Sequence, residues 1–391
     1  MVLGVLVGSV FVGFLASQTQ AQKPVDYEAI AQKLVNQCAS IREGDLVYVG
    51  GGVKNAELLE DIAVNVRKAG GFPLVAIDSD RMTRRMYTDV PAKYDAQSRE
   101  SLAKFVESFS AFIEVSYSED EGLLADIPPA RLEANSRAGA AVTEAIIKRS
   151  PRSVYLGNGL YPTAQLAKRY GLSPDELTRI FWDAVNVDYA KLQSACESAK
   201  GRLTSGKEVR ITNPNGTDLK MRIEGRPVFT SDGVISAEDE KRGYAGCQVY
   251  LPAGEVYVAP VPGTAEGKVV FDRDFIQGME VKKLTMVFKG GKVTSMTAES
   301  GLERLKSRYD VAGAGKDEFS FVDIGVNPNF GEGPGSRFLN YVPAGMITVG
   351  IGSNIEFGGT NNCTFGYQSF LPGSTLTVDG KVLVDKGHLK Y

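Results

Sequence analysis

The sequence predicts an α/β protein, in which an N-terminal α/β domain on a parallel sheet is followed by a β-rich α+β domain. Three observations support this prediction. The 391 residues suffice for about two domains that each bury a core. Between residues 26 and 201, apolar residues alternate between helical and strand spacing. Beyond residue 206 they follow mainly strand spacing, and Gly and Pro separate the runs. We therefore expect domains at residues 22–204 and 205–391.

The N-terminal domain is predicted to begin with a βαβ unit. Strands are expected at residues 46–49 and 74–77, and the helix between them ends at Gly70 and Gly71. Such a unit implies parallel strands joined by a right-handed crossover. Further elements of this domain are expected at residues 112–115 and 154–156 as strands and at 132–149 as a helix.

A later helix is predicted to begin at a capping box. Ser173 is the expected N-cap, Pro174 takes the first helical position and Glu176 completes the box. Trp182, the only tryptophan, lies on this helix and is expected in the core.

The C-terminal domain is predicted to contain hairpins. Alternating apolar and charged residues at 209–211 and 219–223 flank Asn213-Pro-Asn-Gly216, which is typical of a hairpin turn. Further strands are expected at residues 256–258, 269–271, 284–288 and 346–351.

Residues 1–21 are predicted to be an export signal. The run from Val2 to Ala16 is uncharged and too short for a membrane span, and Thr19-Gln20-Ala21 offers small residues for cleavage. A short uncleaved anchor is the alternative, because only the terminal amine supplies positive charge before this run. We expect a periplasmic or extracellular protein with no membrane contact beyond this segment. A net charge of -3 gives no electrostatic case for nucleic acid.

Histidine and cysteine usage limits the possible chemistry. The single histidine is His388, near the C-terminus, so histidine triads and histidine-liganded zinc sites are excluded over the rest of the chain. The four cysteines, Cys38, Cys196, Cys247 and Cys363, are dispersed without a C-x-x-C motif. Export permits disulfides, and isolated buried thiols are the equal alternative.

Two short motifs have ordinary structural interpretations. Gly50-Gly51-Gly52 imitates a dinucleotide-binding turn, but Asn55 stands at the third glycine position, which favours a plain βα connection. Ser101 and Lys104 fit S-x-x-K, but without companion motifs we expect a solvated helix face.

An ordered set of C-terminal segments resembles the M29 family of metallo-aminopeptidases, the aminopeptidase T and aminopeptidase S group. The segments that carry the resemblance are Leu251-Pro-Ala-Gly-Glu-Val256, Ile324-Gly-Val-Asn-Pro-Asn329, Gly345-Met-Ile-Thr-Val-Gly-Ile-Gly352, Gly358-Gly-Thr-Asn361 and Val378-Asp-Gly380. The resemblance covers the chain beyond the signal. It implies a two-domain fold, dimers formed through the C-terminal domain, and two divalent metals that activate water for removal of N-terminal residues from peptides.

Most metal-ligand positions implied by this resemblance are replaced. Glu255 keeps the glutamate of the first segment, but Phe321 stands where a second glutamate is expected. Asp323, two residues along on the same strand face, is the only local carboxylate substitute. Thr348 stands where a histidine is expected. The positions of a later His-x-Asp pair fall on Gly366 and Gln368.

Two functions remain open. We favour an exported, non-catalytic homologue that binds peptides or assembles with itself, without a cofactor, because so few ligands survive. With Phe321 in place of a ligand, we expect a dry, packed pocket and a hydrogen-bonded, structural Glu255. The alternative is an active aminopeptidase with one divalent ion held by Glu255, Asp323 and neighbouring oxygens such as Asp272. An all-oxygen site suits Mg²⁺, Mn²⁺ or Ca²⁺ better than Zn²⁺.

Overall fold

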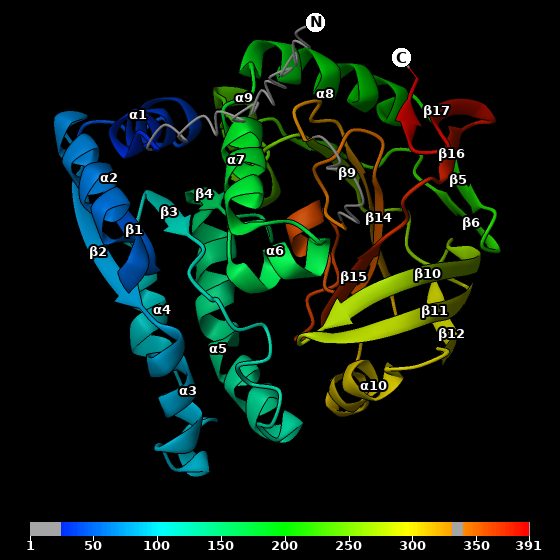
Figure 1. Cartoon of the computed structure of the whole chain (residues 1–391), viewed down its shortest axis with the longest axis horizontal. Helices are drawn as coiled ribbons and strands as arrows, with labels where there is room; N and C mark the ends of the chain where they lie inside the picture. Colours follow the sequence, from blue (N-terminus) through cyan, green and yellow to red (C-terminus); the bar gives the residue numbers. More distant parts are fainter. Residues whose placement is uncertain (1–24, 331–338, 391) are drawn as a thin grey trace, which may run out of the picture.

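The computed structural model describes residues 25–330 and 339–390, so the predicted export signal lies outside the described residues. Within these residues the strands form one parallel and two antiparallel sheets. Figure 1 shows the parallel sheet with its helices on one side of the molecule and the antiparallel sheets on the other. The predicted fold class is confirmed. Among the described helices, none is long and apolar enough to cross a membrane.

The parallel sheet has five strands in the order β2-β1-β3-β4-β8. These strands are β1 (Leu46–Gly52), β2 (Phe72–Asp78), β3 (Ala111–Val115), β4 (Arg152–Leu156) and β8 (Gln248–Leu251). Apolar residues of α2 cover one face and those around α4 and α5 cover the other. The predicted βαβ unit is present, because β1 and β2 pair in parallel around α2.

The helices lie mainly in the N-terminal half. They are α1 (Tyr27–Lys33), α2 (Ala56–Lys68), α3 (Asp80–Thr88), α4 (Glu100–Val106), α5 (Pro129–Arg149), α6 (Ala164–Tyr170), α7 (Pro174–Val185), α8 (Tyr189–Thr204), α9 (Ala237–Lys241) and α10 (Leu302–Val311). The capping box at the start of α7 is confirmed: Ser173 accepts from the Glu176 N–H, and the Glu176 carboxylate accepts from the Ser173 N–H at 2.8 Å. Trp182 is buried, as expected.

The C-terminal half supplies both antiparallel sheets. The eight-stranded sheet contains β5 (Glu208–Asn213), β6 (Thr217–Arg222), β10 (Glu266–Ile276), β11 (Met279–Lys289), β12 (Lys292–Thr297), β16 (Thr375–Val378), β17 (Lys381–Asp385) and β18 (His388–Leu389). The five-stranded sheet contains β7 (Val228–Ser231), β9 (Glu255–Val258), β13 (Phe319–Gly325), β14 (Ile347–Gly352) and β15 (Gly366–Phe370), in the order β15-β14-β13-β9-β7.

The β10–β11 hairpin is longer than the sequence predicts. Charged residues interrupt its apolar runs, so only the apolar centres were recognisable as strands. Its turn consists of Gln277 and Gly278, which both have positive φ, at 50° and 77°. Two-residue hairpin turns of this kind match the twist of the flanking strands. The predicted β5–β6 hairpin is confirmed.

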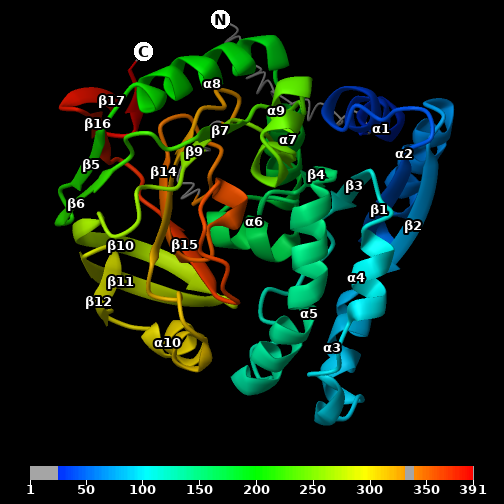
Figure 2. The same cartoon turned by 180° about the vertical axis from the view of Figure 1, so that it is seen from behind.

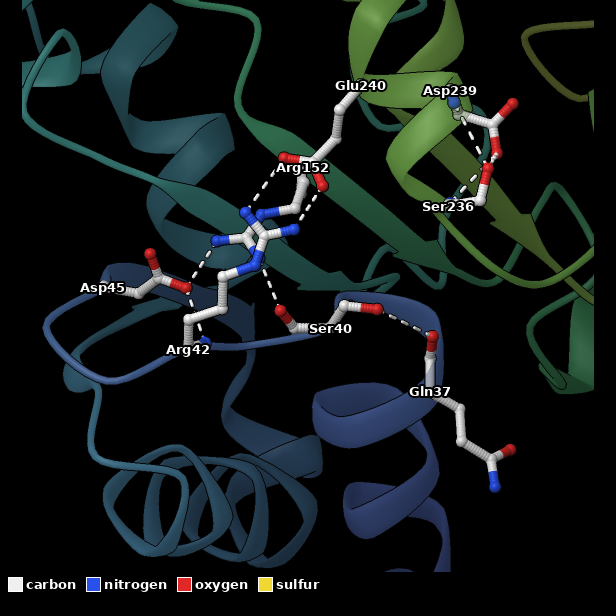
Figure 3. Close-up of polar contacts among 8 residues, drawn as sticks. All are labelled: Gln37, Ser40, Arg42, Asp45, Arg152, Ser236, Asp239 and Glu240. Carbon is white, nitrogen blue, oxygen red and sulfur yellow. Dashed lines mark hydrogen bonds and ion pairs between the residues drawn. The ribbon is translucent and has the colours of Figure 1, made fainter.

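The two halves of the chain share structure. The predicted boundary at residues 204 and 205 falls at the end of α8, but β8 returns to complete the parallel sheet. One polar contact adds to this connection (Figure 3): Arg42 pairs with Glu240 of α9. Within the N-terminal half, Arg152 of β4 donates to Asp45 and to the Ser40 carbonyl. The view from behind shows α9 close to the helical half (Figure 2).

The remaining sequence motifs have structural roles. Gly50, Gly51 and Gly52 lie in β1 itself, and the Asn55 side chain accepts from the Gly52 N–H at 3.0 Å, so no open nucleotide-binding turn forms. Ser101 and Lys104 are exposed on α4, as expected. All four cysteines lie within the described residues and are free thiols. Of the two expectations, the structure therefore has separate thiols and not disulfides.

Candidate functional site

One face of the five-stranded sheet collects the positions identified in the sequence. Asp323 of β13 lies opposite Tyr257 of β9 on one side and opposite Thr348 of β14 on the other. Glu255 is two residues before Tyr257 and therefore lies on the same face. On β15, Gln368 lies opposite Gly350 and Gly366 lies opposite Gly352, which extends the same face. Antiparallel pairing thus brings together residues that are far apart in the sequence.

Asp323 is a buried carboxylate without a partner. Only 1% of the residue is exposed, and no described group makes a hydrogen bond of ordinary geometry to either carboxylate oxygen. Burial raises the pKa of Asp323 well above its usual value, and the neighbouring charge of Glu255 raises it further. The Thr348 hydroxyl and the backbone N–H groups of Ile324 and Val256 lie close enough to lower that pKa in part, although none of them meets ordinary hydrogen-bond geometry. A buried carboxylate without a well-formed hydrogen bond is costly, so it calls for a structural or functional explanation.

Glu255 is buried but hydrogen-bonded. Its carboxylate accepts from the side-chain amide of Asn158, which follows β4 in the other half of the chain. Asn158 has a positive φ of 45° and also donates to the Pro252 carbonyl at 3.2 Å. Burial raises the pKa of Glu255, and the bond from Asn158 offsets part of that rise. The expected hydrogen-bonded Glu255 is therefore present, with a partner that the sequence did not suggest.

Phe321 packs where the resemblance places a ligand. Its ring stacks on Phe357 with centroids 3.7 Å apart and an interplanar angle of 17°. Tyr257 meets Phe357 edge-on at 5.5 Å and stacks with Phe229 at 6.1 Å. These contacts fit the expected packing of Phe321. The expectation of a packed pocket is wrong, because a cavity of about 560 Å³ opens beside these rings.

The cavity is acidic and aromatic. It is lined from the sheet by Glu255 and Asp323, and Glu144 and Glu356 lie at its exposed rim. Its aromatic lining residues are Tyr250, Tyr257, Phe321, Tyr341, Phe357 and Phe365. Among the described residues that line it, none is Lys, Arg or His. Burial raises the pKa of both Glu255 and Asp323, which favours their neutral forms, and a cation bound beside them favours the charged forms.

A second cavity adjoins the first and has different chemistry. It measures about 310 Å³ and shares Tyr341, Gly366 and Gln368 with the acidic cavity. Arg308 of α10 lines it and forms no ion pair with any described acidic residue. Asp274 lines it too, but its oxygens already accept from the Phe275 N–H and the Tyr367 hydroxyl. Arg308 thus has open hydrogen-bond donors, whereas Arg169, the other arginine that lines this cavity, pairs with Glu121.

The donor set does not fit a pair of divalent ions. Within the described ranges, no group of three His, Cys, Asp or Glu residues could hold a metal ion. Glu255 already accepts from Asn158, and the Phe321 ring fills the neighbouring position. Asp272 was expected to supply an oxygen, and this is wrong because it is exposed on β10 of the eight-stranded sheet, bonded to Asn215 at 3.2 Å.

Several residues of this site were missed in the sequence. Glu144 comes from the long helix α5, and Asn158 comes from a loop after β4. Neither carries a motif, because their role arises only where the N-terminal half covers the five-stranded sheet. Glu356 and Phe357 directly precede the family-like segment Gly358-Gly-Thr-Asn361, and this segment was the feature of the sequence that could have pointed to them.

Comparisons with known proteins agree with this geometry. The family described as thermophilic metalloprotease (M29) matches residues 25–323. The structure of wild-type AmpT from Thermus thermophilus is similar at a TM-score of 0.71 and 18% identity, covering 93% of this chain and 99% of that one. A 2,5-dihydroxypyridine dioxygenase from Pseudomonas putida has a TM-score of 0.57 at 12% identity, covering 94% and 98%. No curated protein matches the sequence.

Proposed function

Because the chain belongs to the M29 family of metallopeptidases while its donor set does not fit two ions, we propose that it is an exported, non-catalytic homologue. In this proposal the acidic cavity binds the N-terminal ammonium group of a peptide without a metal ion. The observation that carries it is Asp323, a buried and unpartnered carboxylate that lines a cavity with no basic residue among its described walls.

An ammonium group matches this cavity in charge and geometry. It carries three N–H donors, and the Asp323 carboxylate, which lines the cavity, offers acceptor oxygens. Charge-assisted hydrogen bonds of this kind are about twice as strong as neutral ones. The rings of Tyr257 and Phe321 line the same space, and aromatic rings attract cations through their π systems.

The second cavity supports a peptide as the ligand. A short peptide whose ammonium group lies beside Asp323 can extend past Tyr341 and Gln368 toward Arg308. The guanidinium of Arg308 is suited to a terminal carboxylate, because it offers paired N–H donors. The two cavities then recognise the two charged ends of one molecule.

Calorimetric titration with alanine tripeptides tests this function. We expect binding of the free peptide, and a loss of about tenfold or more on N-acetylation, because one charged hydrogen bond contributes about 1.5–3 kcal/mol. Asp323→Asn should weaken binding similarly. The matched control Asp272→Asn, an exposed carboxylate outside the cavity, should leave it unchanged. Equal binding of the acetylated peptide would contradict the proposal.

The hydrolase alternative has one observation in its favour. Glu255 and Asp323 are two buried carboxylates on adjacent strands and one sheet face, an arrangement that could hold one Mg²⁺, Mn²⁺ or Ca²⁺. Elemental analysis and an aminoacyl amide assay with added ions distinguish the functions. Stoichiometric metal, with turnover that Glu255→Ala abolishes, would establish the hydrolase. N-terminal sequencing of the protein recovered outside the cytoplasm would check export and cleavage after Ala21.

A further inference from the structure

The outer edge of the parallel sheet carries exposed apolar side chains on both faces. β2 is the terminal strand of this sheet and lies at the margin of the molecule in both views (Figures 1 and 2). The exposed fractions are 55% for Phe72, 38% for Leu74, 45% for Val75 and 49% for Ile77. Because side chains alternate along a strand, Phe72 and Leu74 lie on one face and Val75 and Ile77 on the other. Long apolar edge strands are sites of strand pairing.

The free backbone groups of β2 can be assigned. The Phe72 N–H donates to the Asp45 carbonyl at 2.7 Å, so Phe72, Leu74 and Ala76 turn their backbone groups toward β1. Pro73, Val75 and Ile77 therefore turn theirs outward. Pro73 has no N–H, but its carbonyl remains an acceptor. The outward edge thus offers donors at Val75 and Ile77 and acceptors at all three residues.

The charges at the ends of β2 are complementary to each other. At the start of the strand, the Arg67 guanidinium lies 4.9 Å from the Phe72 ring centroid, and it forms no ion pair with any described residue. At the other end, Asp78 also makes no ion pair within the described part of the chain. In an antiparallel pair centred on Val75, Phe72 of one copy lies opposite Asp78 of the other. Each Arg67 then meets the partner's free carboxylate.

We propose that a second copy of this chain docks on β2, with the two strands antiparallel about a two-fold axis at Val75. The two Val75 residues exchange both backbone hydrogen bonds, and each Ile77 N–H donates to the Pro73 carbonyl opposite. The pairing joins the two parallel sheets into one continuous sheet, and it buries the apolar edge. This surface lies in the N-terminal half, whereas the family resemblance suggested dimers through the C-terminal domain.

Aromatic contacts extend this docking surface beyond the strand itself. Leu74 lies beside Tyr48 in the sheet register, Tyr48 meets Phe109 at 5.9 Å, and Phe109 meets Phe105 of α4 at 5.2 Å. Phe105 is 46% exposed and is available to the partner along the same face.

Charge reversal with mixing tests the arrangement by sedimentation of the purified protein. Wild-type protein should be a dimer. Arg67→Asp alone places two like charges together at each end, as does Asp78→Arg alone, and each should weaken the dimer by about tenfold or more. A mixture of the two variants restores opposite charges at both ends and should form heterodimers. The matched control Lys191→Asp on the distant helix α8 should leave the dimer intact.

Two results would overturn the proposal: a monomeric wild-type protein, or a dimer that both single variants retain. Val75→Pro provides a second measurement, because it removes an outward N–H while the bonds to β1 remain. Its circular dichroism should be native and its dimer should be lost. Peptide titrations of the same samples keep this test separate from the proposed function, because β2 does not line the acidic cavity.

Discussion

At the scale of single residues, Phe321 and Asp323 show how one strand can carry an aromatic ring at an expected metal-ligand position and still place a carboxylate in the cavity. They lie two residues apart on β13 and line the same cavity. Phe321 contributes packing, because its ring stacks on Phe357. Asp323 contributes a buried carboxylate that has no hydrogen bond of ordinary geometry within the described chain. The sequence identified both residues, but it could not show that Asp323 lacks a partner, since this depends on the geometry of three adjacent strands.

Replacing Phe321 should be costly for stability. Phe321→Ala removes a ring that is 1% exposed and leaves the Phe357 face uncovered, so we expect a loss of about 3–5 kcal/mol in the free energy of unfolding. Urea unfolding measures the change. Tyr94→Ala, at a position that is 48% exposed, should cost less than about 1 kcal/mol. Similar costs for the two variants would contradict the buried stacking.

At the scale of secondary-structure elements, local patterns predicted several of the helices and about half of the strands. The capping box at Ser173 placed the start of α7 at the correct residue, because caps depend on neighbouring side chains alone. The β10–β11 hairpin was underestimated, because its exposed charged residues break the apolar pattern. Arg152 at the start of β4 carried no motif, yet it joins this strand to the loop before β1.

The ion pair of Arg152 should be important because it is buried. The side chains of Arg152 and Asp45 are 5% and 13% exposed, so Arg152→Met leaves a buried carboxylate without its main partner. We expect a loss of about 3–5 kcal/mol in unfolding free energy. Arg210→Met, which breaks the exposed pair with Asp218, should cost about 1 kcal/mol or less. Equal losses would show that the burial of the Arg152 pair has no effect.

At the scale of the whole molecule, the two halves are joined. β8 completes the parallel sheet from the C-terminal half, and buried residues of both halves form one continuous core. A boundary at residues 204 and 205 describes the order of the chain. Because β8 from the C-terminal half completes the sheet of the N-terminal half, the N-terminal sheet depends on both halves.

Thermal unfolding should therefore occur in one cooperative transition. Calorimetry of the purified protein checks this, and the calorimetric and van't Hoff enthalpies should agree for the unfolding unit. Two resolved transitions would show that the halves unfold independently despite the shared sheet.

The sequence by itself determined the fold class, the family resemblance and the loss of histidine ligands, because these depend on residue types and their order along the chain. Only the tertiary structure decided that the surviving carboxylates line an acidic cavity, that Asn158 and Glu144 reach it from the other half, and that Arg308 opens into the adjoining cavity. The physical reason is that strand pairing joins residues more than sixty positions apart, and packing between the halves joins residues more than two hundred positions apart. No local pattern records such contacts.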